Sequence, residues 1–365
     1  MSDFVTPQVV AREALSILMN NLVLGNLIYT DASQDFVQGV GDTVSIRRPS
    51  AIAAREFTGT PVTQDLVRET KVDVKLDKHM YVQVPVTGVE LTTSIQRFSE
   101  QVIQPAIIGH AQAIDAAIAG LYRDIYTSTP VSGTPSVADI AAVGRALSVN
   151  KVPFTERRLV LDPVVHAKYV TLDAFLHAEK RGGVEAIRDA EVGRVLGLDA
   201  YIDQNIVTHV RGTVTSGNAT GTAGASTVAL ASLSGATHTL LRGDIFTIAG
   251  DTQPYVVTEN RTASGSAIAS CPISPALKTS PSGAAIAVVD TAGLNALAFH
   301  KTAFALAVRP LAPPLGQKSE VVSYNGLSLR VVYGWDNTLL SDAVTIDCLW
   351  GVKTLDPERA VRLID

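Results

Sequence analysis

The chain has little cysteine and little charge, and each shortage bears on the class of protein. Cys271 and Cys348 are too few for a disulfide framework and lack the spacing of metal ligands. A reducing compartment fits this composition. Charged residues make up 18% of the 365 residues and hydrophobic residues 46%. Because soluble domains usually carry about 25% charge, we expect partners to cover much of the surface.

Positive charge is also in short supply. Lys and Arg total 30 against 35 acidic residues, a net charge of −5, so the electrostatic footprint of a sequence-specific nucleic-acid binder is missing. A weak or internal contact with nucleic acid stays open. The opening MSDFVTPQVV has no basic or apolar region of a signal peptide, and no stretch approaches 18 apolar residues, so no membrane partner is expected.

Motifs that carry chemistry are missing as well. The sequence contains no nucleophile elbow, no phosphate-binding glycine loop and no H-E-x-x-H pair, and its carboxylates are scattered. Arg242-Gly243-Asp244 spells an adhesion tripeptide but leads directly into an apolar strand, so adhesion is not expected. The sequence therefore predicts a protein that is not an enzyme, with no catalytic, cofactor-binding or metal site. An enzyme without these motifs stays an alternative.

The strongest feature present is a helical signal from Leu91 to Tyr126. Apolar residues recur there at steps of three and four, which predicts a buried stripe made of Ile107, Ala111, Ile114, Ile118, Leu121 and Ile125. Pro105 marks a kink or a fresh helix start. An earlier helix is predicted over residues 6–24, with Thr6 as cap and Pro7 at its first position. It is either an arm that docks on a neighbouring subunit or the first helix of the local core.

A long hairpin is predicted between these helices. One strand lies within Gly39–Ser50, and its partner KVDVKLDKHMYVQVPV alternates apolar and polar residues over about 16 positions, roughly 50 Å. We expect its apolar face to lie on an adjacent subunit; two strands of an ordinary sandwich are the alternative. The other face is predicted to make inter-subunit contacts through Arg47, Arg48, Lys71, Asp73, Lys75 and Asp77.

The rest of the chain divides by composition into an α/β part and an all-β part, as the length leads us to expect. Ser136 caps a predicted helix, RRLVL is a buried strand, and Asp162 with Pro163 opens another helix. From Arg211 to Asp290 only eight of 80 residues are charged, and the short strands STVAL, DIFTIAG, PYVVTE, SAIAS and AAIAVV are separated by turns. This stretch is predicted to be an inserted all-β module.

This order of elements resembles the major capsid proteins of tailed bacteriophages. The resemblance rests on the arm helix, the hairpin opening GDTVSIRRP, the long helix, and the stretches EVGRVLGLDAYIDQNI and LAFHKTAFALAVRPL. The β module with RGDIFTIAG is similar to the insertion domain of P-twenty-two-like coat proteins. The resemblance implies an α+β protein of the Hong Kong 97-type capsid fold, with an N-arm, an E-loop hairpin, a spine-helix peripheral domain, an α/β axial domain and an inserted all-β domain.

The resemblance also implies domain boundaries. The N-terminal arm would be 1–38, the extended hairpin 39–88, the peripheral domain 89–135 with 335–365, the axial domain 136–207 with 291–334, and the inserted β domain 208–290.

The function implied is that of a structural major capsid protein whose hexamers and pentamers form an icosahedral shell around packaged double-stranded DNA. It would be part of the virion capsid, assembled in the bacterial host cytoplasm, with a portal protein as partner and the DNA touched by non-specific internal contacts. Because few residues precede the arm helix, a separate scaffolding protein is expected. The cross-linking residues of some family members have no match here. The alternatives are an encapsulin-type compartment with an enzyme cargo, and a soluble enzyme or adhesive module.

Overall fold

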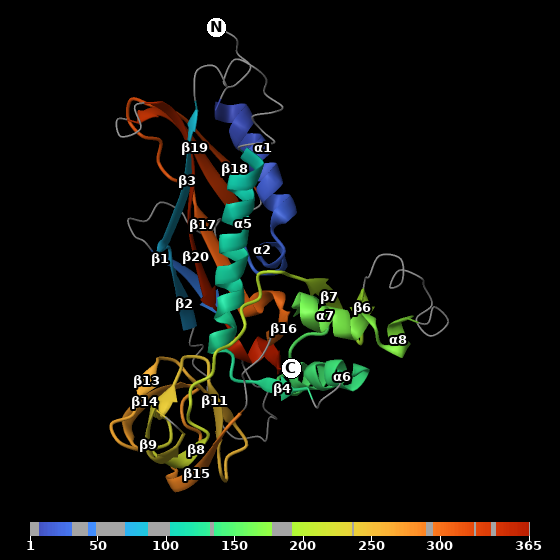
Figure 1. Ribbon diagram of the computed structural model, residues 1–365, viewed down its shortest axis with the longest axis vertical. Coiled ribbons are helices and arrows are strands. Elements are labelled where there is room, and N and C mark those ends of the chain that lie inside the picture. Colours follow the sequence, from blue (N-terminus) through green and yellow to red (C-terminus); the bar gives the residue numbers. More distant parts are fainter. Residues whose placement is uncertain are drawn as a thin grey trace, which may run out of the picture. The chain divides into compact units, whose positions relative to one another are not determined.

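The chain divides into two compact units in a computed structural model (Figure 1). The structure describes residues 7–30, 43–48, 70–86, 103–131, 135–176, 192–235, 237–289, 295–324, 326–336 and 341–364. The first unit comprises Met1–Asn21, Tyr29–Ala111 and Ala305–Leu355, and the second comprises Leu22–Ile28, Gln112–Phe304 and Asp356–Asp365.

A five-stranded sheet forms the first unit. Its order is β17 (Phe304–Arg309), β20 (Ser341–Thr354), β19 (Leu327–Asp336) and β18 (Lys318–Tyr324), and β3 (Lys78–Val86) also pairs with β20. Helix α1 (Pro7–Asn21) lies on β18 and β19, as Figure 1 shows. It buries the stripe Val10, Ala11, Ala14, Leu15 and Leu18. The predicted helix is confirmed, and it belongs to the core of its own unit.

The predicted hairpin strand is two strands. β1 (Thr43–Arg48) pairs with β2 (Thr70–Lys75), as predicted, and the register places Val44 opposite Val74. The chain then breaks at Leu76 and Asp77, and β3 pairs with β20 instead. The prediction of a single strand of about 16 residues was therefore wrong. The break falls where Lys78 would occupy an apolar position of the alternating pattern.

The predicted long helix is α5 (Gln104–Ala119), continued by the 3-10 helix η3 (Gly120–Asp124). All six stripe residues are buried, which confirms the helical period. Pro105 lies in the first turn of α5, where its missing amide hydrogen costs nothing, so a fresh start fits better than a kink. The proposed capping residues Thr93 and Gln96 lie outside the described residues.

The second unit contains a six-stranded mixed sheet. Its order is β4 (Ser128–Pro130), β21 (Ala360–Ile364), β16 (Asn295–His300), β5 (Arg157–Leu161), β7 (Leu198–Ile202) and β6 (Arg194–Val195). Helices α6 (Val137–Val149) and α7 (Pro163–Val170) share one core cluster with one face of this sheet. Both predicted helix starts are confirmed, because Asp139 accepts a bond from the Ser136 amide and Asp162 caps Val164.

Short elements complete this part of the unit. They are α2 (Leu24–Leu27), α8 (Asp173–Leu176), η4 (Lys301–Ala303) and η5 (Pro357–Arg359).

The all-β stretch forms a closed barrel in the same unit. Its strands are β11 (Ile245–Ile248), β12 (Pro254–Val257), β14 (Ile268–Ser274), β9 (Thr227–Ser234), β8 (Ser216–Thr220) and β15 (Ser282–Val288). A side ribbon pairs β10 (Thr239–Leu240) with β13 (Arg261–Thr262). Strand β8, SGNAT, was not among the predicted strands because it has little apolar alternation. Closure leaves the barrel without an unpaired edge.

The strands of residues 291–365 are shared between the two sheets, and the points of change differ from the domain boundaries that the resemblance implies. Within 291–334, β16 joins the six-stranded sheet, whereas β17, β18 and β19 join β20. Within 335–365, β20 belongs to the first unit and β21 to the second. The alternation of apolar residues identifies these strands, but it does not specify which sheet each one completes.

No helix among the described residues is long and apolar enough to cross a membrane.

Candidate assembly surface and barrel junction

The inner face of the β1–β2 ribbon is buried within the first unit. Val44, Ile46, Val74 and Leu76 form a cluster with Ala305 and Ala307 of β17. The expectation that a neighbouring subunit covers this apolar face is therefore wrong for Val74 and Leu76, whereas Val72, Met80, Val82 and Val84 are only half-buried. Alanines on β17 leave room for the ribbon to approach closely.

A glycine permits a second close approach of this ribbon. A Cβ built on Gly351 of β20 would lie 2.0 Å from the carbonyl oxygen of Lys75 at the end of β2. Real side chains do not tolerate such a contact, so any larger residue would push β2 away from β20. The ribbon is thus fitted to its own unit through both β17 and β20.

The predicted contact residues lie mainly on the outer face of this ribbon. Lys71, Asp73 and Lys75 are exposed, and they stand opposite Arg47, Ser45 and Thr43 in the register. Arg48 pairs with Thr70, one position out of this row. Asp77 is exposed in the link between β2 and β3.

Two residues of this row make weak contacts within the ribbon. Asp73 accepts a bond from the Ser45 hydroxyl at 2.5 Å, and Lys71 Nζ lies 3.9 Å from Asp73. Exposed ion pairs of this kind contribute about 0–1 kcal/mol. The ion pair between Lys71 and Asp73 therefore adds little to the stability of the ribbon.

The five-stranded sheet of the first unit carries a cluster of charged residues joined by shorter hydrogen bonds. Arg330 donates from Nε and Nη2 to the two oxygens of Asp347, at 2.9 and 2.5 Å, and His79 Nε2 lies 3.1 Å from the same carboxylate. Asp347 is buried, and these cross-strand bonds satisfy it. The cluster joins β3, β20 and β19, so we interpret it as structural.

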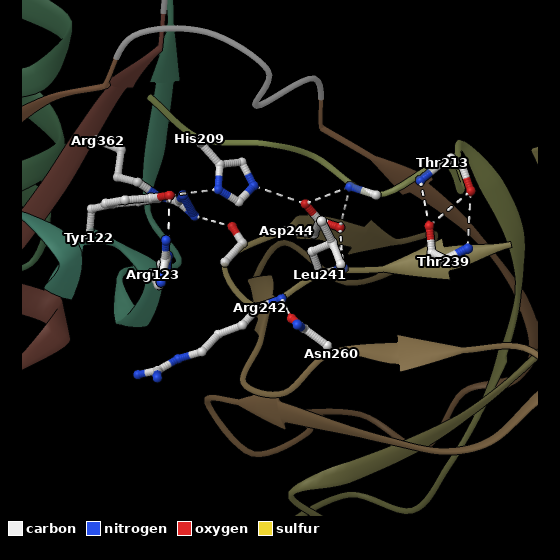
Figure 2. A network of polar contacts seen from close by, with 12 residues as sticks. Tyr122, Arg123, His209, Thr213, Thr239, Leu241, Arg242, Asp244, Asn260 and Arg362 are labelled. Atoms are coloured by element: carbon white, nitrogen blue, oxygen red, sulfur yellow. Dashed lines mark hydrogen bonds and ion pairs between the residues drawn. The ribbon is translucent and has the colours of Figure 1, made fainter. Parts of the chain in front are cut away.

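A buried polar relay joins the barrel to the end of the long helix within the second unit. Figure 2 shows His209 between Tyr122 of η3 and Asp244 of the barrel. Tyr122 Oη lies 2.9 Å from His209 Nδ1, and His209 Nε2 lies 2.9 Å from Asp244 Oδ1. A carboxylate only accepts, so Nε2 carries the hydrogen and Nδ1 accepts from the tyrosine hydroxyl.

Backbone amides satisfy the other oxygen of the buried aspartate. Asp244 Oδ2 accepts from Gly212 N at 3.0 Å and Leu241 N at 2.8 Å. Asp244 is 0% exposed and His209 is 3% exposed. A tyrosine, a histidine and an aspartate joined by successive hydrogen bonds resemble a catalytic relay. No substrate can reach side chains buried this deeply. The relay is a structural link.

Each residue of the turn Arg242-Gly243-Asp244 makes a separate contact at this junction, and that of Asp244 is the bond to His209. Arg242 Nη2 lies 2.8 Å from Asp124, and the Gly243 carbonyl accepts a bond from Arg362 Nη2 of β21. Gly243 has φ +100, and a Cβ there would lie 3.1 Å from His209 Cε1. Glycine is therefore required by both backbone conformation and space.

Arg362 is the charged centre of the sheet side of the junction. It is fully buried on β21, donates from Nε to Ile125 O at 3.1 Å, and lies over the Tyr122 ring at 5.3 Å. Burial lowers the pKa of its guanidinium to about 10. Apolar contacts between Tyr126, Ile245 and Val256 complete the junction.

This relay was not predicted from the sequence, although one residue signalled a buried polar contact. Arg362 is a single charged residue inside the apolar strand AVRLI, and such a residue needs a buried partner. Tyr122 and His209 are 87 positions apart, so local patterns could not pair them.

Potential metal ligands do not cluster in the part of the chain that the structure describes. That part contains no group of three potential metal ligands. Cys271 and Cys348 are buried, and burial raises the pKa of each thiol to about 12. Such thiols are poor nucleophiles at neutral pH.

Comparisons with known proteins identify the fold. The sequence matches no protein-family model and no curated protein. The structure is similar to one from Mycobacterium phage Che8, with a TM-score of 0.53 and 15% identity over 94% of this chain and 90% of that chain. It is also similar to the capsid structure of cyanophage P-SCSP1u, with a TM-score of 0.51 and 13% identity over 94% and 88% of the two chains. The chain therefore has the α+β, Hong Kong 97-type fold of phage capsid proteins that the sequence predicted.

Proposed function

We propose that this chain is a structural capsid protein, many copies of which close into an icosahedral shell around packaged double-stranded DNA. The observation that carries the proposal is the fold likeness, which extends over 94% of this chain and 88% of the cyanophage capsid chain. The likeness therefore extends over most of both chains and is not confined to one domain.

Each part of the fold has a role under this proposal. The β1–β2 ribbon lies within 39–88, the segment expected to be the E-loop, and the barrel corresponds to the inserted domain. The long helix with the five-stranded sheet corresponds to the peripheral domain, and the six-stranded sheet with α6 and α7 to the axial domain. These assignments move β17, β18 and β19 from the axial to the peripheral domain.

Electron microscopy of the purified protein, with and without a co-expressed scaffolding protein, tests the proposal. Closed particles tens of nanometres across support it, whereas a small defined oligomer under both conditions contradicts it. The contents of particles from the natural source separate the two shell functions. Double-stranded DNA and a portal protein support a capsid, and an enzyme cargo identifies an encapsulin-type compartment.

We further propose that the outer face of the ribbon is an assembly contact. Reversal of Lys71 and Lys75 to Glu changes the charge of this exposed row by four units while leaving the buried face of the ribbon intact. The subunit should fold normally, since neither side chain is buried. Assembly should fail or give particles of the wrong size, because each small contact is repeated in every subunit. Adding Arg47 and Arg48 to the reversal should strengthen the defect.

The matched control reverses Arg145 on α6 and Lys278 in the barrel loop, both exposed, for the same charge change. Circular dichroism reports folding and sedimentation velocity reports particle size. Normal particles from the ribbon variant would remove the row from the assembly contacts. An equal defect in the control variant would assign the effect to net charge.

A further inference from the structure

A second buried polar cluster in the second unit holds the segment Leu22–Ile28 on α5. The carboxylate of Asp115 is 1% exposed and accepts from Val23 N at 2.8 Å and Gly25 N at 2.9 Å. These amides lie at the start of the short helix α2. At its other end the Leu27 carbonyl accepts a bond from Arg158 of β5. Side chains of opposite charge thus hold both ends, each with the sign that the helix dipole favours.

A second buried carboxylate acts on the first. Asp203 follows β7, is 3% exposed, and accepts from the amide and side chain of Asn205 through Oδ1. Its Oδ2 is buried without a hydrogen-bond partner among the described residues. The nearby Arg158 donates to the Leu27 carbonyl and not to Asp115. Among the described residues, no ion pair balances the charge of Asp115. The negative charge of Asp203 therefore opposes ionisation of Asp115.

These surroundings act on Asp115 in opposite directions. Burial raises the pKa of its carboxyl, the bonds from Val23 and Gly25 lower it, and the charge of Asp203 raises it. The net result is a pKa of about 6, against an ordinary value of 3.8. Ionisation of this group is therefore less favourable in the folded chain than in the unfolded chain.

We propose that Asp115 is a proton-linked clasp, in which its protonated buried carboxyl keeps Leu22–Ile28 on α5 and loss of the proton loosens the segment. The proton comes from and returns to solvent. The neighbouring residues, up to Asn21 and from Tyr29 on, are counted with the first unit. The clasp therefore anchors this short segment within the second unit. This inference is independent of shell formation, since its readout lies in the single subunit.

The direction of the pH effect follows from the raised pKa. A group with a higher pKa in the closed state than in the open state favours closure at low pH, and this advantage is lost as pH rises through about 6. With 3.8 for the open state, the opening equilibrium increases about tenfold between pH 5 and pH 8. Protection of the Val23 and Gly25 amides should fall by the same factor.

Hydrogen exchange by mass spectrometry on the full-length subunit measures this directly, after correction for the intrinsic pH dependence of exchange. Peptides covering Leu22–Ile28 should lose about tenfold protection from pH 5 to pH 8, while peptides from α6 should not change. Asp203→Asn removes the repulsion and should move the transition to lower pH. Asp115→Asn should remove the transition.

Asp199→Asn is the matched control, because Asp199 lies on β7, four positions before Asp203, and its partly exposed side chain lies 3.5 Å from Arg194. It should leave the transition unchanged. Equal protection of Leu22–Ile28 at pH 5 and pH 8 in the natural sequence would overturn the proposal. An equal shift by Asp199→Asn and Asp203→Asn would also overturn it. The natural sequence and Asp203→Asn decide the matter even if Asp115→Asn fails to fold.

Discussion

The relay between η3 and the barrel predicts a graded set of stability losses. Tyr122→Phe keeps the aromatic ring and its contact with Arg362 but removes the hydroxyl that bonds to His209 Nδ1 at 2.9 Å. It also removes the acceptor for Arg123 Nε at 3.3 Å. Because His209 is buried, its Nδ1 is left without a partner, which costs about 1–3 kcal/mol. The midpoint of thermal unfolding should fall by about 2–4 °C for each kcal/mol, if the unit of 150–250 residues unfolds cooperatively.

Replacing the aspartate should cost more. Asp244→Asn keeps the shape but places an NH2 group opposite donors from His209, Gly212 or Leu241. At least one buried donor then faces another, and removing one partner of a buried charged network costs about 3–5 kcal/mol. Tyr81→Phe is the control, because Tyr81 is 66% exposed and its change should stay within about 0.5 kcal/mol.

Thermal and denaturant unfolding of the dissociated subunit give the order of the three variants. Hydrogen exchange at Gly212 and Leu241 locates the loss, since both amides bond to Asp244. The reasoning fails if Tyr122→Phe is no less stable than Tyr81→Phe. It also fails if protection is lost throughout the six-stranded sheet and not at the barrel junction.

Two further predictions concern close packing and burial. Gly351→Ala should loosen the β1–β2 ribbon, because the new Cβ would lie 2.0 Å from Lys75 O. Faster proteolysis and faster hydrogen exchange at β2 would show this. The control is Gly144→Ala on α6, where a Cβ meets nothing within 4 Å, and it should be neutral or stabilising by up to about 1 kcal/mol. Cys271 and Cys348 should resist a thiol reagent at pH 8 until the subunit unfolds, because burial raises the pKa of both thiols to about 12, and rapid labelling of either in the native subunit would contradict this burial.

Local signals account for the parts of the fold that the sequence predicted correctly. The stripe from Ile107 to Ile125, the Pro7 start of α1, and the caps at Ser136 and Asp162 each depend on residues a few positions apart. The helix or strand they specify forms wherever its apolar side finds a surface. This is why these predictions hold without knowledge of the partner elements.

Non-local pairing accounts for what could not be predicted. The alternation over Lys71–Val86 is continuous enough to suggest one strand, yet β2 and β3 pair with different partners, 43–48 and 341–354. A two-residue link suffices for the change of partner, and its only sequence trace is the misplaced Lys78. Apolar periodicity likewise could not assign β17 and β18 to the sheet of β20, because any half-buried sheet accepts such strands.

The turn at 242–244 shows how the barrel can be both separate and fixed. A closed barrel offers no strand edge to the rest of the unit, so its attachment depends on side chains and turns. The residues that attach it, among them His209, Arg242 and Asp244, are not members of the barrel's apolar core. Attachment and internal stability are therefore carried by different residues, and the junction can be weakened without unfolding the barrel. For the same reason, the apolar alternation that identifies the barrel strands contains no information about where the barrel is attached.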